Sequence, residues 1–416
     1  MSAPSSHRRA DCRLCGGRRL ELALKLAPTP PANAFVPAEK LAEPQRAYPL
    51  DLFLCLDCAH LQLLDVVDPA ALFEDYVYVS GTSPVFVEHF RQYAELCVHK
   101  YALEAGRLAV DVGSNDGTLL RFFQEHGLKV LGVDPAKEIA ARATGSGVET
   151  MAAFFTLPLA RELKAVRGPA AIVTANNVFA HSDKLAEIAE GIRELLDENG
   201  VFVFEVSYLV DVYEKTLFDT IYHEHVAYHS VRPLVPFLAR CGLELIEAER
   251  VGTHGGSLRG VAQLKGGPRP VGASVAKLVA LEDRLGLHEP ETWAAFSKNI
   301  DQRKGELAAM LAKVKAQGKR VAGFGAPAKA TTLMHHFGLG KDQIEFIVDD
   351  SPLKQGLYTP GLHVPVLPPR ALEERRPDYL LILAWNFAPS IVQKNRRFVD
   401  EGGRFIVPLP KVEMIG

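Results

Sequence analysis

The chain has 416 residues, which is too long for one ordinary hydrophobic core and indicates two or three domains. Its 48% hydrophobic and 23% charged residues are typical of a soluble globular protein, and its formal net charge of −3 provides no diffuse basic surface for nucleic acid. No apolar stretch reaches the roughly 18 residues of a membrane span, and residues 1–9 lack the apolar region of a signal peptide. We expect a cytoplasmic monomer without nucleic-acid or membrane partners.

Four of the six cysteines form two C-x-x-C pairs, which are Cys12 with Cys15 and Cys55 with Cys58. Two such turns, brought together by a small sheet, would place four thiolates at the corners of a tetrahedron of zinc-ligand size. Four thiolates leave no open coordination position, so the zinc would be structural. Two disulfides or four buried thiols are the alternatives, and a reducing cytosol disfavours the disulfides. We therefore expect a zinc-binding module over residues 1–74.

The module is followed by a short segment in which hydroxyl side chains alternate, at Tyr76, Tyr78 and Ser80. In an extended chain, residues two apart share one face, so these three hydroxyls would point the same way. We expect this face to contact the substrate.

Between about residues 84 and 265, helical and strand patterns alternate, which predicts a parallel sheet with helices on both faces. The expected elements are helix 85–103, strand 108–112, helix 117–126, strand 129–133, helix 136–142, strand 171–174, helix 183–196 and strand 201–206. Residues 250–262 are expected to form a strand, a glycine turn and a returning edge strand. Together, residues 75–265 form the second predicted domain.

The first strand of this domain leads into a turn framed by Gly113 and Gly117. A strand, a glycine turn and a helix N-terminus let backbone N–H groups approach a ligand closely, and Asp134 at the end of the next strand can accept hydrogen bonds from ribose hydroxyls. The turn lacks a complete G-x-G-x-x-G motif, and Asp111 and Asp116 would repel a diphosphate but attract the sulfonium of S-adenosylmethionine. We predict an S-adenosylmethionine site, with a purely structural turn as the alternative.

A long helical region over about 271–316 is expected to end at Gly318, and a second α/β pattern follows. Its elements are strand 320–324, a turn that opens a helix, and strands 344–348, 379–384 and 405–407. Gly323, Gly325 and Ala328 approximate G-x-G-x-x-A. We therefore expect residues 266–416 to form a second Rossmann-like domain, related to the first by a diverged duplication.

The densest group of titratable residues is the segment 220–229, which contains Tyr222, Glu224 and His225. Tyr222 and His225 could face one way on a helical turn, and Glu224 could orient an imidazole for general-base chemistry. A metal site and a solvated polar loop are the alternatives. In the segment N-N-V-F-A-H, Asn176 could contact the cofactor and His181 could reach the substrate, although a core or capping histidine is an equal alternative.

These motifs together resemble the S-adenosylmethionine-dependent sugar C-methyltransferases, which act on dTDP-linked keto-deoxysugars in antibiotic biosynthesis. The resemblance rests on the paired C-x-x-C turns and on D-V-G-S-N-D-G, N-N-V-F-A-H, Y-H-E-H-V, T-H-G-G-S-L-R and G-F-G-A-P-A-K, in that order along nearly the whole chain. Length and motif positions are close to the branch that methylates C-3′ in D-tetronitrose biosynthesis. The resemblance implies a zinc module, a central cofactor domain and a C-terminal domain that anchors the nucleotide sugar.

Matched position by position, the resemblance assigns cofactor binding to Gly113, Asn115, Asp116, Gly117, Asp134 and Asn176. It assigns the active site to Tyr76, His181, Tyr222, Glu224 and His225. His225 would remove the C-3′ proton beside a 4′-ketone, Tyr222 or His181 would stabilise the enolate oxygen, and Glu224 would hold the base. Substrate contacts are expected from Tyr78, Ser80, Lys329, Arg259 and Asn386. Asn115 stands where many methyltransferases have a glycine, which leaves the geometry of the turn open.

Two other functions fit parts of the pattern. A nicotinamide-dependent oxidoreductase acting on nucleotide sugars could use the second glycine turn. A non-catalytic module that binds zinc and a nucleotide would explain both folds without the histidine cluster.

Overall fold

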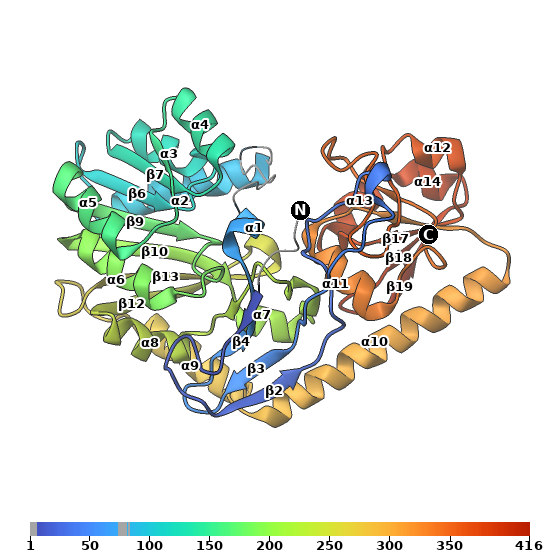
Figure 1. Ribbon diagram of the computed structural model, residues 1–416, viewed down its shortest axis with the longest axis horizontal. Coiled ribbons are helices and arrows are strands. Elements are labelled where there is room, and N and C mark those ends of the chain that lie inside the picture. Colours follow the sequence, from blue (N-terminus) through green and yellow to red (C-terminus); the bar gives the residue numbers. More distant parts are fainter. Residues whose placement is uncertain (1–5, 74–80, 82–83) are drawn as a thin grey trace.

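The computed structural model describes residues 6–73, 81 and 84–416 (Figure 1). Tyr76, Tyr78 and Ser80 lie outside the described residues, so their proposed roles remain predictions. Among the described helices, none is long and apolar enough to cross a membrane.

The N-terminal module is a small antiparallel sheet, and one of its strands comes from far along the chain. Its order is β11-β4-β3-β2, where β11 (Ala227–Tyr228) follows directly on the Y-H-E-H segment. The other strands are β2 (Leu20–Leu24), β3 (Leu52–Cys55) and β4 (Leu61–Leu63). A separate pair, β1 (Ser6–Arg8) and β5 (Asp65–Val67), precedes α1 (Pro69–Phe73). The zinc module and the histidine segment therefore share one sheet.

The central domain contains a seven-stranded sheet in the order β12-β13-β10-β9-β6-β7-β8. Its strands are β6 (Leu108–Val112), β7 (Lys129–Asp134), β8 (Thr150–Ala152), β9 (Ala170–Asn176), β10 (Leu196–Ser207), β12 (Leu243–Val251) and β13 (Ser257–Leu264). Its helices are α2 (Pro84–Lys100), α3 (Thr118–Glu125), α4 (Lys137–Gly145), α5 (Leu157–Arg167), α6 (Leu185–Leu195), α7 (Leu209–Glu214), α8 (Val231–Arg240) and α9 (Ala273–Arg284).

Two expectations for this sheet are wrong. The sheet is mixed rather than parallel, because β13 runs antiparallel to both of its neighbours. The returning strand is also not at the edge, because β13 inserts between β10 and β12 and leaves β12 outermost. The tight glycine turn before β13 brings it back beside β12, and its apolar residues pair with the buried strand β10.

Helices cover both faces of the central sheet, as predicted. Val110 and Val173 pack into a core with α5 and α6, whereas Ala109 and Ile172 pack into a second core with α2 and α3. Adjacent residues of a strand point to opposite faces, so one apolar strand supplies both cores. The polar groups that end these strands are left at the carboxyl edge of the sheet, where open α/β sheets bind ligands.

The C-terminal domain repeats the strand order of the central sheet. Its order is β16-β15-β14-β17-β18-β19, in which all strands except β19 are parallel. The strands are β14 (Val321–Phe324), β15 (Ile347–Val348), β16 (Val366–Leu367), β17 (Tyr379–Ile382), β18 (Arg404–Val407) and β19 (Glu413–Ile415), and the helices are α11 (Ala328–Phe337), α12 (Ala371–Arg375), α13 (Ala388–Lys394) and α14 (Arg396–Asp400). Numbered along the chain, the first five strands of each sheet lie in the order 3-2-1-4-5, which supports the expected duplication.

The region expected to be one long helical stretch is two helices, because residues 285–289 interrupt it between α9 and α10 (Pro290–Ala316). Helix α10 packs against β2 and runs from the central part of the molecule to the C-terminal domain (Figure 1). The connection between β2 and β3 in the N-terminal module reaches the same domain, where Val36 pairs with Tyr358 and the Thr331 hydroxyl donates to the carbonyl of Ala32. The N-terminal module thus contacts both Rossmann-like domains, and the boundaries expected at 74 and 265 remain a prediction.

Candidate active site and zinc site

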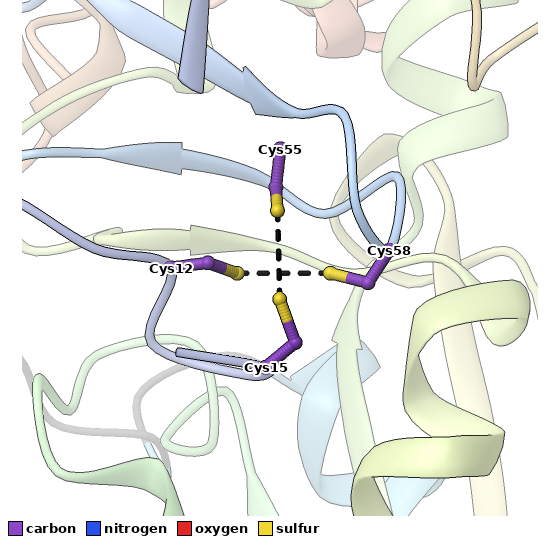
Figure 2. A group of neighbouring side chains, drawn as sticks. All are labelled: Cys12, Cys15, Cys55 and Cys58. Carbon is purple, nitrogen blue, oxygen red and sulfur yellow. Dashed lines mark hydrogen bonds between the residues drawn. The ribbon is translucent and has the colours of Figure 1, made fainter. Parts of the chain in front are cut away.

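The four cysteines of the two C-x-x-C turns converge on one point (Figure 2). The Sγ atoms of Cys12 and Cys58 lie 3.6 Å apart, those of Cys15 and Cys55 lie 3.5 Å apart, and all four lie within 4.8 Å of one another. A tetrahedral zinc with Zn–S bonds of about 2.3 Å needs S–S separations of roughly 3.8 Å. The donor set and its spacing therefore fit a closed, structural zinc.

All six cysteines are thiols, so the disulfide alternative is wrong. Cys97 and Cys241 are buried away from this group, as predicted. Within the group, the hydrogen bond between Cys12 and Cys58 lowers the pKa of Cys12 to about 5 and raises that of Cys58. Four thiols this close cannot all ionise without a cation, because the negative thiolates would repel one another. A divalent cation would stabilise all four thiolates, so the group is a favourable cation site.

The predicted cofactor turn is a strained connection between β6 and α3. Gly113 has φ of +72°, and a Cβ atom there would lie 2.2 Å from the Val178 side chain. Asn115 also has a positive φ, of +50°, which asparagine tolerates better than most residues. The turn is therefore pressed against the segment that follows β9, and only glycine fits at its first position.

Asp134 holds this turn in place from the end of β7. Its carboxylate accepts hydrogen bonds from the backbone N–H groups of Asn115 and Ala136, both at 2.9 Å. Burial raises the pKa of Asp134, and the two backbone donors oppose that shift. A carboxylate offers about four lone-pair positions, so the two that remain can still accept from ribose hydroxyls.

Asn176 lies at the end of β9, opposite Glu205 of β10. Both polar atoms of its side-chain amide are buried and have no hydrogen-bond partner among the described residues. Buried amides in proteins are nearly always paired, so this one indicates a ligand partner. The site residues thus fit a nucleoside cofactor at the carboxyl edge of the sheet.

The other two aspartates of this region already have partners. Asp116 accepts from the backbone and hydroxyl of Thr118 at the start of α3 and from the backbone of Gly81. Asp111 is fully buried and accepts from the Thr174 hydroxyl at 2.6 Å, and burial raises its pKa to about 7. Gly117, with φ of +75°, is the residue directly before α3.

The structure brings together three of the predicted catalytic residues. The ring of His225 lies 4.2 Å from that of Tyr222 and 4.9 Å from that of His181, measured between centroids. Tyr222 and His225 lie on a tight turn closed by a 2.8 Å backbone hydrogen bond, rather than on the helical turn that we expected. The Nδ1 atom of His225 lies 2.8 Å from the carbonyl oxygen of Thr220, and the ring of Phe73 stacks on His181.

Glu224 contacts the N-terminal module. The Asn33 amide donates to its carboxylate at 2.9 Å, and the Glu224 side chain is buried. The Nδ1 of His225 is held by the Thr220 carbonyl. The idea that Glu224 itself orients the base therefore remains a prediction.

Lys329, one of the two substrate residues predicted in the C-terminal domain, belongs to a group of side chains with Asp219 and Trp385. The Lys329 ammonium lies 3.7 Å from the carboxylate of Asp219 and 4.0 Å from the centre of the Trp385 ring. Trp385 also donates its indole N–H to Asp219 at 2.6 Å, and the neighbouring Asn386 has a buried side-chain oxygen without a partner among the described residues. Burial lowers the pKa of Lys329 and raises that of Asp219, while their attraction opposes both shifts.

Arg259 does not join this group. It lies on β13, where its guanidinium pairs with Glu205 at 2.6 Å and packs over the ring of Tyr93. Glu205 also accepts from His89 at 2.9 Å. Arg259 is thus neutralised by a buried carboxylate in the central domain.

Two residues that contact the predicted site residues were not predicted from the sequence. Asp219 stands only three residues before Tyr222 and could have been included with that segment. Asn33 is distant in sequence from Glu224, which it contacts, and no sequence pattern distinguishes it.

Three family models match successive parts of the chain. A "Putative zinc binding domain" matches residues 12–73, a "Methyltransferase domain" matches 87–248, and a "C-methyltransferase C-terminal domain" matches 252–410. C-methyltransferase NovU from Streptomyces niveus is 36% identical over 405 residues, which cover 97% of this chain and 96% of NovU.

More distant likenesses occur among solved structures. Magnesium protoporphyrin IX methyltransferase (ChlM) from Synechocystis PCC 6803 with bound SAM is 17% identical, with a TM-score of 0.32 over 43% of this chain and 80% of that chain. A S-adenosylmethionine-dependent methyltransferase from Clostridium acetobutylicum ATCC 824 is 14% identical, with a TM-score of 0.34 over 43% and 92%.

Fold, site and relatives define a methyltransferase that uses S-adenosylmethionine and carries an N-terminal zinc-binding module. More specifically, the chain belongs to the C-methyltransferase family that includes NovU. This membership decides against the oxidoreductase and the non-catalytic module that the sequence had left open.

Proposed function

We propose that this enzyme transfers a methyl group from S-adenosylmethionine to C-3′ of a dTDP-linked 4-keto-deoxysugar, in antibiotic deoxysugar biosynthesis. We further propose that the substrate is a 3-amino sugar. The closeness of His225 to Tyr222 and His181 carries the proposal, because this reaction needs a base close to groups that can stabilise an oxyanion. The motif order along the chain supports the substrate class.

Methylation at carbon needs a nucleophilic carbon, and an ordinary ring carbon is not one. A carbon next to a ketone becomes nucleophilic when its proton is removed, because the charge spreads onto the ketone oxygen. A 4′-ketone would activate C-3′ in this way. The enzyme therefore has to supply a base and a donor for the developing oxyanion.

His225 is the proposed base. In a neutral imidazole only one nitrogen carries a proton, and donation to the Thr220 carbonyl at 2.8 Å requires that proton on Nδ1. The Nε2 atom is then the unprotonated nitrogen that can take the C-3′ proton. His181, whose ring lies 4.9 Å away, is the alternative base.

Each electron pair in the proposed reaction has a defined destination. As His225 takes the proton, the C–H pair forms the enolate double bond and the ketone π pair moves to oxygen, where Tyr222 or His181 donates a hydrogen bond. Bound S-adenosylmethionine supplies an electrophilic methyl group and leaves as S-adenosylhomocysteine. The enolate pair becomes the new C–C bond, and the ketone is restored.

Lys329 and Asn386 are the proposed anchors of the nucleotide sugar. Lys329 stands at the start of α11, where its charge and the backbone N–H groups would both favour a diphosphate. The side-chain oxygen of Asn386, which has no partner within the described part of the chain, would accept from a substrate N–H or O–H group. Arg259 is a weaker candidate, because it lies in the central domain and its ion pair with Glu205, at 2.6 Å, is closer than that of Lys329 with Asp219, at 3.7 Å.

Incubation of the enzyme with methyl-labelled S-adenosylmethionine and a panel of dTDP-sugars tests the proposal. We expect label at C-3′ of 4-keto sugars and none in the corresponding 4-hydroxy sugars. Label on oxygen or nitrogen, or equal labelling of 4-hydroxy sugars, would contradict the enolate route.

A further inference from the structure

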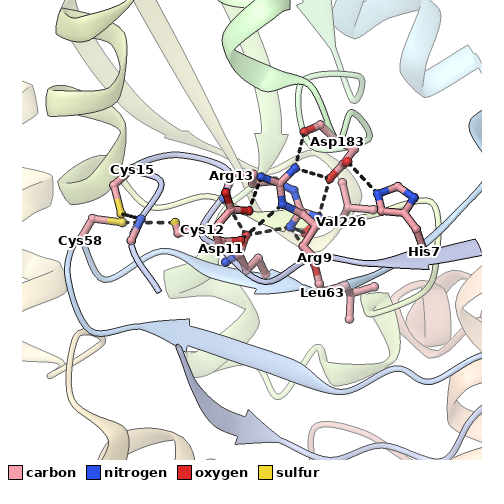
Figure 3. Close-up of polar contacts among 12 residues, drawn as sticks. His7, Arg9, Asp11, Cys12, Arg13, Cys15, Cys58, Leu63, Asp183 and Val226 are labelled. Carbon is pink, nitrogen blue, oxygen red and sulfur yellow. Dashed lines mark hydrogen bonds and ion pairs between the residues drawn. The ribbon is translucent and has the colours of Figure 1, made fainter. Parts of the chain in front are cut away.

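Arg13 stands between two zinc ligands, yet its side chain points away from them and is fully buried. Its Nη1 atom donates to the carbonyls of Val226 and Leu63 at 2.7 and 2.8 Å. Its Nη2 atom donates to the carboxylate of Asp183 at 3.1 Å (Figure 3). One guanidinium therefore connects the cysteine turn with β4 of the same module and with two segments of the central domain, at residues 183 and 226.

Those two segments carry the two histidines of the active site. Asp183 is two residues after His181, and Val226 is the residue after His225. The segments also contact each other, because the Val226 N–H donates to the carbonyl of Ala180 at 3.0 Å. Arg13 thus bonds to both histidine segments, and the rings of His181 and His225 on these segments lie 4.9 Å apart.

Arginine suits this task better than lysine. Its planar fork offers donors in fixed directions, so it can bond to a carboxylate on one side and carbonyls on the other. A buried cation that loses its partners is costly, so the bonded arrangement is strongly preferred over a displaced one. A zinc held by Cys12 and Cys15 would fix the backbone on both sides of Arg13.

Arg9 provides a natural comparison. It also donates to Asp183, to the carboxylate at 3.0 Å and to the backbone carbonyl at 3.3 Å, but its other partner is Asp11 in the N-terminal module. Arg9 therefore shares the ion pair of Arg13 but not the bond to the His225 segment.

We propose that Arg13 is a positioning residue that transmits the rigidity of the zinc module to His181 and His225 and sets the spacing of their imidazoles. The proposal rests on the proposed function in one respect, which is the catalytic role of the two histidines. It gives the zinc module a task in the reaction, although the metal itself is closed to substrate.

The test compares Arg13→Met and Arg13→Lys with the control Arg9→Met. Zinc content and calorimetric affinity for S-adenosylmethionine establish that each variant is folded and loaded. The direct readout is the pair of ring-nitrogen NMR signals of His181 and His225 in protein labelled with 15N-histidine, assigned through His181→Asn and His225→Asn. The functional readout is solvent deuterium exchange at C-3′ with S-adenosylhomocysteine in the cofactor site.

We expect Arg13→Met to keep zinc and cofactor binding but to shift both histidine signals and slow exchange, by up to about a hundredfold for a displacement near 1 Å. Arg13→Lys should recover part of the loss, and Arg9→Met, which keeps the bond from Arg13 to Val226, should leave the His225 signals and the exchange rate close to those of the wild type. Unshifted histidine signals in folded Arg13→Met would overturn the proposal, as would equal shifts in Arg9→Met.

Two further outcomes are distinguishable. Shifted signals with undiminished exchange would support the positioning role and would contradict the proposed function, because the exchanging base would then lie elsewhere. If Arg13→Met does not fold, Asp183→Asn provides the same test with the guanidinium intact. Unshifted histidine signals in Asp183→Asn would then overturn the proposal.

Discussion

Replacing Asp134 by alanine should weaken S-adenosylmethionine binding through two effects. The variant loses the carboxylate that would accept from the ribose hydroxyls, and hydrogen bonds to charged groups contribute about 1.5–3 kcal/mol. It also releases the backbone N–H groups of Asn115 and Ala136, now held at 2.9 Å, so the cofactor turn loosens. Since 1.4 kcal/mol corresponds to a factor of ten, we expect a dissociation constant raised roughly tenfold to a hundredfold.

The C-terminal domain offers a matched control for the loosened turn. Asp349 directly follows β15 and accepts from the backbone N–H groups of Ala326 and Ser351, at 2.6 and 2.8 Å, much as Asp134 does after the second strand of the central sheet. Asp349→Ala should lower the melting temperature as Asp134→Ala does, but leave S-adenosylmethionine affinity unchanged in titration calorimetry. Unchanged S-adenosylmethionine affinity in Asp134→Ala, or an equal loss of this affinity in Asp349→Ala, would contradict the proposed contact between Asp134 and the ribose.

Three further predictions concern the metal, the sheet and the sugar site. Elemental analysis should find one zinc per chain, and Cys55→Ser should lose it together with thermal stability; folded, active protein without zinc would contradict the site. The pKa of Asp111 is raised to about 7, so between about pH 4 and pH 7 the folded state holds a proton that the unfolded state has lost, and this contribution to stability disappears as the pH rises. Denaturation of wild type and Asp111→Asn across this window should show the variant gaining relative stability with pH; a constant difference would contradict the burial argument. Lys329→Met should raise KM for the nucleotide sugar roughly tenfold or more without changing S-adenosylmethionine affinity, as for a lost charge-assisted contact.

The structural features that the sequence predicts best are those determined by residues close together in the chain. Strand β6 occupies the expected residues 108–112, because an apolar run between turn residues has few other options. Strand β15 is shorter than the expected 344–348, because the N–H of Ile344 donates to the carbonyl of Gly340 at the end of a turn and not to a neighbouring strand. The interior place of β13 could not be read from periodicity, which does not encode strand order.

The candidate site also contains residues that the local sequence indicates and residues that only the folded structure brings together. Gly113, Asp134 and Asn176 can be predicted as candidates because they lie at or directly after strand ends, and parallel strands bring such ends to one edge. Asn33 and Arg13 were missed because their contacts join residues 191 and 213 positions apart in the chain. Such contacts depend on how the N-terminal module docks, which no local pattern of residues indicates.

We propose that His225 removes the C-3′ proton, and proton exchange measures that step without methyl transfer. With S-adenosylhomocysteine bound, wild-type enzyme should exchange the C-3′ hydrogen of a dTDP-4-keto sugar for solvent deuterium. His225→Asn should bind both ligands but exchange roughly two to four orders of magnitude more slowly, the usual contribution of a general base. Undiminished exchange in His225→Asn would contradict the account and make His181 or Tyr222 the next candidate.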